Sequence, residues 1–215
     1  PAVAIVDPEL MYSMPKGLTA ATGMDALTHA IESYITPGAW AMSDMFEIKA
    51  IEMIAQNLKA AVDNGKDTVA REAMSQAQYI AGMGFSNVGL GIVHSMAHPL
   101  GAFYDTPHGV ANALLLPYVM EYNAESPAAP KYKDIAKAMG VNVDGMTCEE
   151  GVKAAVEAVK ALSISINIPQ KLNEIGVKEE DLPALAVAAF NDVCTGGNPR
   201  PTSIEDIEKI YRKAF

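Results

Sequence analysis

The chain contains only four histidines, and all of them lie in two short segments. His29 belongs to TGMDALTHAIE, whereas His94, His98 and His108 belong to GLGIVHSMAHPLGAFYDTPHG, residues 89–109. Imidazole is a ligand suited to zinc, iron, copper or nickel, and a carboxylate from a neighbouring turn can complete such a site. A chain that uses its histidines in this way has to fold so that the two segments meet.

A carboxylate lies at helical spacing from the first histidine. Asp25 precedes His29 by four residues, and on a helix these two side chains rise from the same face about one turn apart. Both can therefore reach one ion. Asp105 is a second nearby carboxylate, but it lies in a turn-like segment, where aspartate commonly bonds to its own backbone, so we rank it below Asp25.

Spacing alone does not decide which histidines of the second segment are metal ligands. His94 and His98 have the same four-residue spacing, whereas His108 follows ten residues later, beyond an expected break at residues 99–101 and a turn at 105–107. Such a break can fold the chain back so that His108 faces the first helix. Two ligands from one helix, or one from a helix and one from a loop, are both feasible, and a lone histidine is more often a hydrogen-bonded core residue.

The pattern of apolar residues is helical in most of the chain. Cap residues and apolar periodicity predict helices over residues 19–34, 43–62, 68–86, 110–122, 131–139, 148–166, 180–192 and 203–215. This pattern predicts an all-α protein, a bundle of about eight helices.

The first six residues, PAVAIV, form a short apolar run ended by Asp7 and Pro8, which predicts a buried β-strand. A lone strand has no partner. We therefore expect residues 1–10 to be the last strand and linker of a missing N-terminal domain, and residues 11–215 to be a helical metal-binding domain.

Composition argues against several kinds of partner. Half of the 215 residues are apolar, enough for one substantial core. The net charge is −10 and the 16 basic residues form no run, which argues against nucleic acid. The longest apolar stretch, residues 110–120, is too short to cross a bilayer. Cys148 and Cys194 lie far apart, which fits unpaired thiols in a reducing cytoplasm.

Two segments, GMDALTHAIESY and GFSNVGLGIVHSMAHPLGAFYDTPHGVANALLLP, resemble the signature regions of the iron-containing (group III) alcohol dehydrogenases. The likeness runs through the whole chain, including DVCTGGNPR, and points to the branch that interconverts lactaldehyde and 1,2-propanediol. It implies a dehydroquinate synthase-like helical C-terminal domain. It also implies an upstream α/β domain that binds NAD or NADP, with a homo-oligomer as one possibility.

The resemblance further implies roles for particular residues. In the family the metal ligands fall on the positions of Asp25, His29, His94 and His108. His98 matches the family's middle histidine, which lies near the substrate and is a candidate for relaying the alcohol proton. Phe85 and Cys194 match positions close to the substrate or the nicotinamide. The family implies Fe²⁺, and three imidazoles with a carboxylate would also accept Zn²⁺.

These expectations describe the metal-binding half of an NAD(P)-dependent alcohol dehydrogenase, in which the ion acts as a Lewis acid on a small alcohol or diol and its aldehyde. Alone, the chain is expected to bind metal without turning over alcohol, because nothing cradles the cofactor phosphates. Two alternatives stay open. One is a zinc enzyme domain of the glycerol dehydrogenase or dehydroquinate synthase kind, and the other is a non-catalytic helical domain whose ion only joins helices.

Overall fold

The computed structural model describes residues 2–215, which form α-helices and short 3-10 helices and contain no strand. The α-helices are α1 (Lys16–Ile35), α2 (Ala41–Asp63), α3 (Thr68–Val88), α4 (Ile92–Tyr104), α5 (His108–Asn123), α6 (Tyr132–Ala138), α7 (Cys148–Ser165), α8 (Leu182–Phe190) and α9 (Ile204–Ala214). The 3-10 helices are η1 (Pro8–Met11), η2 (Ala129–Lys131), η3 (Leu172–Ile175), η4 (Glu179–Asp181) and η5 (Thr195–Gly197). The expected all-α class is therefore confirmed.

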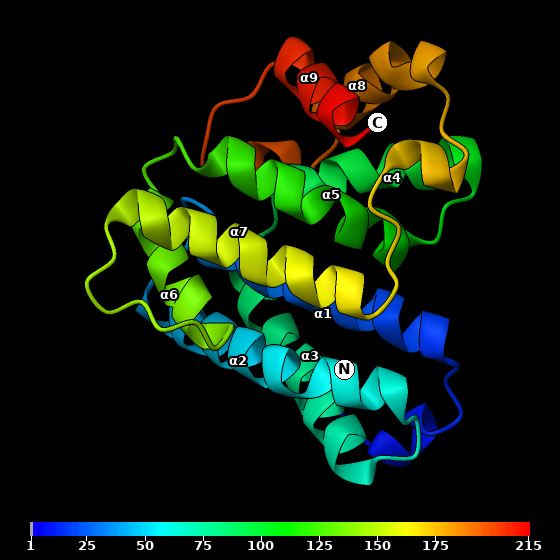
Figure 1. Ribbon diagram of the computed structural model, residues 1–215, viewed down its shortest axis with the longest axis vertical. Coiled ribbons are helices and arrows are strands. Elements are labelled where there is room, and N and C mark those ends of the chain that lie inside the picture. The colour runs from blue at the N-terminus through cyan, green and yellow to red at the C-terminus, as the bar shows by residue number, and fades with distance from the viewer. Residues whose placement is uncertain (1) are drawn as a thin grey trace.

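Helix α1 runs through the centre of the molecule, where it packs on α2, α3 and α5. In Figure 1, α1, α2 and α3 form the lower part, α4 and α5 lie above α1, and α8 and α9 form the top. Fourteen of the twenty residues of α1 are buried, so this helix has no broad polar face. Its small residues allow close packing; at Gly23, a side chain would collide with Leu58 of α2.

The strand expected over residues 1–6 does not form. Residues 2–7 have no regular structure, the side chains of Val3 and Ile5 are exposed, and Pro1 lies outside the described residues. A strand needs a neighbour for its backbone hydrogen bonds, and the described residues offer none. Helical structure begins at Pro8 with η1, so the expected domain boundary after residue 10 falls inside η1.

The break expected at residues 99–101 is also absent, because α4 continues through Pro99 to Tyr104. A proline inside a helix removes one backbone hydrogen bond, but here buried Met96 and Leu100 on either side hold the helix in the core. The chain turns instead after Tyr104, where Asp105 adopts a left-handed conformation with φ 54°. Among the described residues, the second histidine segment thus forms an α-helix, α4, that the apolar pattern did not predict in addition to the other eight.

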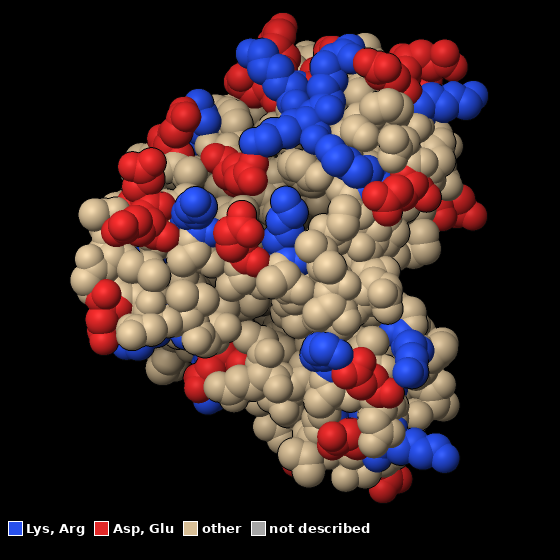
Figure 2. Space-filling model, viewed as in Figure 1, with Lys and Arg blue, Asp and Glu red and all other residues tan. Residues whose placement is uncertain are grey.

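The surface carries both signs of charge. Figure 2 shows Lys and Arg side chains lying next to Asp and Glu side chains on the face in view. Among the described residues, no helix combines the length and apolar character that a membrane crossing requires.

Candidate metal centre

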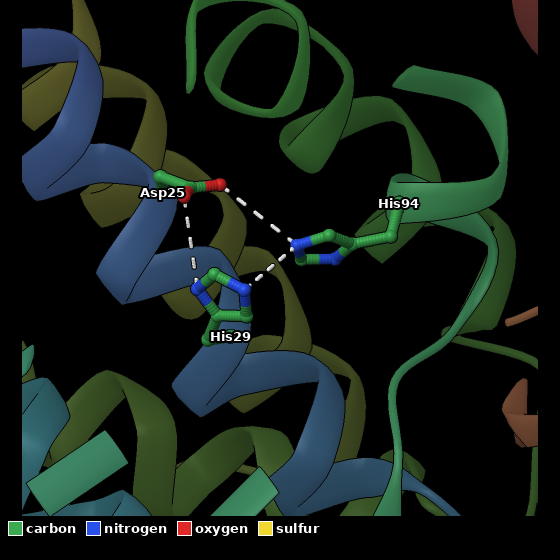
Figure 3. A group of neighbouring side chains, drawn as sticks. All are labelled: Asp25, His29 and His94. Atoms are coloured by element: carbon green, nitrogen blue, oxygen red, sulfur yellow. Dashed lines mark hydrogen bonds and ion pairs between the residues drawn. The ribbon is translucent and has the colours of Figure 1, made fainter. Parts of the chain in front are cut away.

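Helix α1 brings Asp25 and His29 together as their spacing predicts. They lie one turn apart, with Asp25 Oδ2 and His29 Nδ1 separated by 3.8 Å, and each side chain is 20% exposed. Both project toward α4 (Figure 3). Both side chains are partly exposed on a helix of which fourteen residues are buried, so these two polar groups face a site and not the core.

His94 approaches the same point from α4. Its Nε2 lies 3.1 Å from His29 Nε2 and 3.8 Å from Asp25 Oδ1, as the dashed lines in Figure 3 mark. One ligand atom from each of these three residues lies within 4.8 Å of the others. The two histidine segments therefore meet, although they are 65 positions apart.

Glu32 holds His94 in place, and the sequence reasoning missed it. Glu32 Oε2 lies 2.5 Å from His94 Nδ1, and Oε1 accepts the backbone N–H of Val93 at 2.7 Å. The carboxylate also sits at the N-terminus of α4, where negative charge is favoured. A signal was available, because Glu32 follows His29 by three residues on the same face of α1.

His108 is the first residue of α5 and approaches the same oxygen of Asp25 that faces His94. Its Nε2 is 3.5 Å from Asp25 Oδ1, and its ring centroid is 5.4 Å from that of His94. The start of α5 can come this close because Gly109 faces the backbone of Ala21, where a side chain would lie 2.4 Å from the carbonyl oxygen. His108 is 44% exposed, so it forms the open edge of the cluster.

Asn112, one turn further along α5, is a second residue that sequence reasoning missed. Its Nδ2 donates to Asp25 Oδ1 at 2.6 Å and lies 3.0 Å from His108 Nε2. It therefore links the carboxylate of α1 to the histidine of α5.

His98 lies one turn beyond His94 but contacts a different carboxylate. Its Nδ1 is 2.7 Å from Oδ2 of Asp192, in the loop after α8, and its ring stacks on His108 with centroids 5.4 Å apart. It is 41% exposed, and both His98 and the predicted ligand His108 lie outside the group formed by Asp25, His29 and His94. Asp105 makes no hydrogen bond or ion pair with a histidine among the described residues, and it caps the C-terminus of α4.

A pocket of about 410 Å³ opens beside this cluster and is lined by Asp25, His29 and Phe85 among others. Phe85 stacks on His29 with ring centroids 4.5 Å apart and an angle of 19° between the rings. Cys194 does not line this pocket; its backbone N–H donates to Asp192 Oδ1 at 2.9 Å, so it touches the partner of His98.

The pKa shifts of three histidines in the cluster differ in direction. Burial, together with the charge of His94, lowers the pKa of His29 to about 4. Burial also lowers the pKa of His108. Burial would lower the pKa of His94 as well, but the hydrogen bond and charge of Glu32 outweigh it and raise that pKa. Neutral imidazole is the form that binds metal, and His29 and His108 are held in it at neutral pH.

The cluster fits a divalent ion by its donor chemistry. Imidazole nitrogens bound to one ion at 2.0–2.1 Å lie about 2.9–3.4 Å apart, and the Nε2 atoms of His29 and His94 are 3.1 Å apart. A proton on one Nε2 would satisfy only one of these contacts, whereas a cation attracts both nitrogens and the Asp25 carboxylate. The Glu32–His94 contact is the carboxylate–histidine arrangement that surrounds metal-binding imidazoles in proteins.

Known proteins match both the sequence and the fold. Residues 19–215 match the Fe-containing alcohol dehydrogenase family, C-terminal. The whole chain is 60% identical to lactaldehyde reductase of Escherichia coli (strain K12) and 46% identical to NAD-dependent methanol dehydrogenase of Bacillus methanolicus, covering 56% of each protein. A crystal structure of 1,3-propanediol oxidoreductase superimposes on the whole chain with a TM-score of 0.98 and 48% identity, over 56% of that chain. The chain spans about half the length of these relatives.

Proposed function

This chain belongs to the Fe-containing alcohol dehydrogenase family, and from that premise we propose that it is the metal-binding half of an NAD(P)-dependent oxidoreductase acting on a small alcohol or diol and its aldehyde. The observation that carries the proposal is the meeting of Asp25, His29 and His94 within 4.8 Å, beside an open pocket. The 60% identity to a lactaldehyde reductase favours lactaldehyde and 1,2-propanediol as the pair of compounds.

In this proposal Asp25, His29, His94 and His108 hold one divalent ion, Fe²⁺ or Zn²⁺. The donor set of three imidazoles and one carboxylate suits either ion. When bound, the ion supplies Lewis-acid polarisation of an alcohol or carbonyl oxygen, and NAD(P) supplies the hydride acceptor. His108 is included because its Nε2 lies 3.5 Å from Asp25 Oδ1, whereas His98 forms no hydrogen bond or ion pair with Asp25 or His29 among the described residues.

The remaining residues of the site shape the substrate space. Phe85 covers His29 and gives the pocket an apolar wall, which excludes water from the reacting atoms. His98 takes the alcohol proton, because its imidazole is 41% exposed and lies beside His108, and imidazole is the side chain most often used for general acid–base catalysis. Cys194 acts indirectly, through the loop that carries Asp192.

A pocket lined by two of the proposed ligands, Asp25 and His29, favours catalysis over a purely structural ion. A structural ion has a closed coordination shell, whereas a catalytic ion keeps a position open to water or substrate in addition to its protein ligands. The pocket of about 410 Å³ is lined by Asp25 and His29, so an oxygen of a small alcohol has room to approach the proposed ion from their side. Both cysteines are free thiols, which supports a location in a reducing compartment, the cytoplasm.

The first test is elemental analysis of the purified chain after anaerobic addition of Fe²⁺ or Zn²⁺. About one equivalent should remain after gel filtration, and Asp25→Ala, His29→Ala, His94→Ala and His108→Ala should each lose most of it. His98→Ala is the matched control, because it removes an imidazole from the same cluster and should keep the ion. Retention by His108→Ala with loss by His98→Ala would replace His108 by His98 in the ligand set.

The second test measures activity in a chimera. The N-terminal part of the Escherichia coli lactaldehyde reductase, which lies outside the 56% that this chain matches, is joined to residues 1–215. We expect NAD-dependent oxidation of 1,2-propanediol that Asp25→Ala abolishes. The chain alone should show none. Activity of the chain alone, or a metal-loaded chimera that oxidises no alcohol, would contradict the proposal.

A further inference from the structure

The proposed function uses His98 but gives no role to the carboxylate that contacts it, Asp192. These residues are 94 positions apart, on α4 and in the loop after α8, and His98 Nδ1 lies 2.7 Å from Asp192 Oδ2. The side chain of Asp192 is only 17% exposed, although it lies in a loop. Aspartate side chains in loops are mostly exposed, so the inward orientation of Asp192 indicates a specific contact with His98.

The second oxygen of Asp192 is also fixed. Oδ1 accepts the backbone N–H of Cys194 at 2.9 Å, so the two carboxylate oxygens have separate partners and the group cannot rotate freely. Burial alone would raise the pKa of Asp192, but the hydrogen bonds from Cys194 and His98 outweigh it and hold that pKa below its ordinary value. Asp192 is therefore an ionised acceptor at neutral pH, with no proton to donate.

The loop that carries Asp192 is itself pressed against α4. Thr195 Oγ1 lies 2.8 Å from Ser95 Oγ, one residue after His94. Gly197 approaches the backbone of Leu90 so closely that a side chain would lie 1.9 Å from the carbonyl oxygen. These contacts fix the DVCTGGN segment, residues 192–198, relative to the helix that bears both histidines.

We propose that Asp192 is a positioning residue that holds the proton of neutral His98 on Nδ1 and leaves the lone pair of Nε2 free. The physical reason is that an ionised carboxylate accepts but cannot donate, so the nitrogen facing it has to carry the proton. No described residue forms a hydrogen bond with Nε2 of His98, and the side chain is 41% exposed, so that nitrogen is free to accept a hydrogen bond.

This inference rests on the proposed function, and it specifies which nitrogen of His98 accepts the proton. The hydroxyl proton of the alcohol passes to His98 Nε2 while Nδ1–H stays bonded to Asp192, and the resulting imidazolium is stabilised by the carboxylate. In the reverse direction Nε2–H returns the proton to the oxygen of the reduced aldehyde. The opposite tautomer would present N–H to the alcohol and could not accept its proton.

Substitution by asparagine tests the tautomer directly. In Asp192→Asn the amide oxygen can keep the Cys194 N–H, and the amide nitrogen then faces His98 Nδ1 as a donor, which drives the imidazole proton to Nε2. Asp192→Ala removes the partner and should leave both tautomers populated. Asp181→Asn is the matched control, because Asp181 binds the Tyr104 hydroxyl at the far end of α4 and does not touch a histidine.

The readout is the ¹⁵N–¹H correlation spectrum of imidazole nitrogens in the full chain with Zn²⁺ added, in which four histidines give four resolvable systems. We expect the Nδ1–H pattern for His98 in the parent and in Asp181→Asn, and the Nε2–H pattern in Asp192→Asn. Unchanged signals of the other histidines show that the variant is folded. An Nε2–H pattern in the parent, or an unchanged pattern in Asp192→Asn, would overturn the inference.

Activity of the chimera separates this inference from the function on which it rests. Asp192→Asn should lower kcat/KM for 1,2-propanediol by roughly 10²–10⁴-fold, the range that general acid–base catalysis contributes, with Asp181→Asn unchanged. A tautomer switch without loss of activity would support Asp192 as the positioning residue and remove His98 from the proposed mechanism.

Discussion

Glu32 Oε2 and His94 Nδ1 are 2.5 Å apart, and both side chains are almost fully buried, 3% and 2% exposed. Because Glu32 also accepts the N–H of Val93, one carboxylate fixes the start of α4 and the ring of its first histidine. The Nε2 of His94 is thereby aimed at Asp25 and His29. The proposed metal centre thus depends on a residue that need not touch the ion.

Glu32→Gln should weaken metal binding about 10–100-fold, the usual effect of losing a carboxylate behind a metal-binding histidine. The amide oxygen can still accept from Val93, but the amide nitrogen then faces His94 Nδ1 and favours a proton on Nε2, the proposed ligand atom. Competition of the chain with a chromogenic chelator for Zn²⁺ measures the change. Glu47→Gln, at the other buried glutamate, is the control, and equal affinities in the two variants would contradict this role.

Glu47 should make the stability of the chain depend on pH. It is fully buried, neither oxygen has a hydrogen-bond partner among the described residues, and burial raises its pKa to about 8. The unfolded chain loses this proton near pH 4.5 but the folded chain keeps it, so the contribution of Glu47 to stability falls as pH rises from about 4.5 to 8.

Glu47→Gln removes this dependence, since an amide does not ionise. Between pH 4.5 and 8, the free energy of unfolding of the variant should rise relative to that of the parent by on the order of 4 kcal/mol. Urea unfolding of both proteins at several pH values measures it. A constant difference across this range would show that Glu47 is not protonated in the folded chain.

Gly109→Ala should loosen both the fold and the metal centre. The added methyl group would lie 2.4 Å from the carbonyl oxygen of Ala21, and because that neighbour is backbone, α5 has to move away from α1. We expect a loss of about 1–3 kcal/mol in stability and weaker Zn²⁺ binding, since His108 moves with α5. Gly17→Ala is the control; nothing lies within 4 Å of the new methyl group, and alanine favours a helix.

Asn112→Asp should make the chain depend on metal for its stability. The substitution places a second carboxylate at the atom that now donates to Asp25 at 2.6 Å, and two like charges at that distance repel. The melting temperature should fall without metal and rise more than that of the parent when Zn²⁺ is added. Asn123→Asp, in the buried amide pair with Asn198, should also destabilise the chain but gain nothing from Zn²⁺.

Local pattern was enough to predict most of the helices and part of the site. Helical periodicity placed eight of the nine α-helices that residues 2–215 form within a few residues of their observed bounds. The spacing of Asp25 and His29 predicted that they share a face, because a helix repeats every 3.6 residues whatever surrounds it. The concentration of histidine in two segments predicted that these segments meet, as they do through His94.

The partners of the histidines came only from the tertiary structure. Asp192 lies 94 positions from His98, and Asn112 lies 87 positions from Asp25, and no local periodicity relates residues so far apart. The continuity of α4 through Pro99 was decided in the same way, because buried neighbours outweigh one missing hydrogen bond. Sequence pattern fixes what a segment does by itself. Which carboxylate meets which imidazole depends on how whole helices pack, and packing sums weak contacts over the entire core.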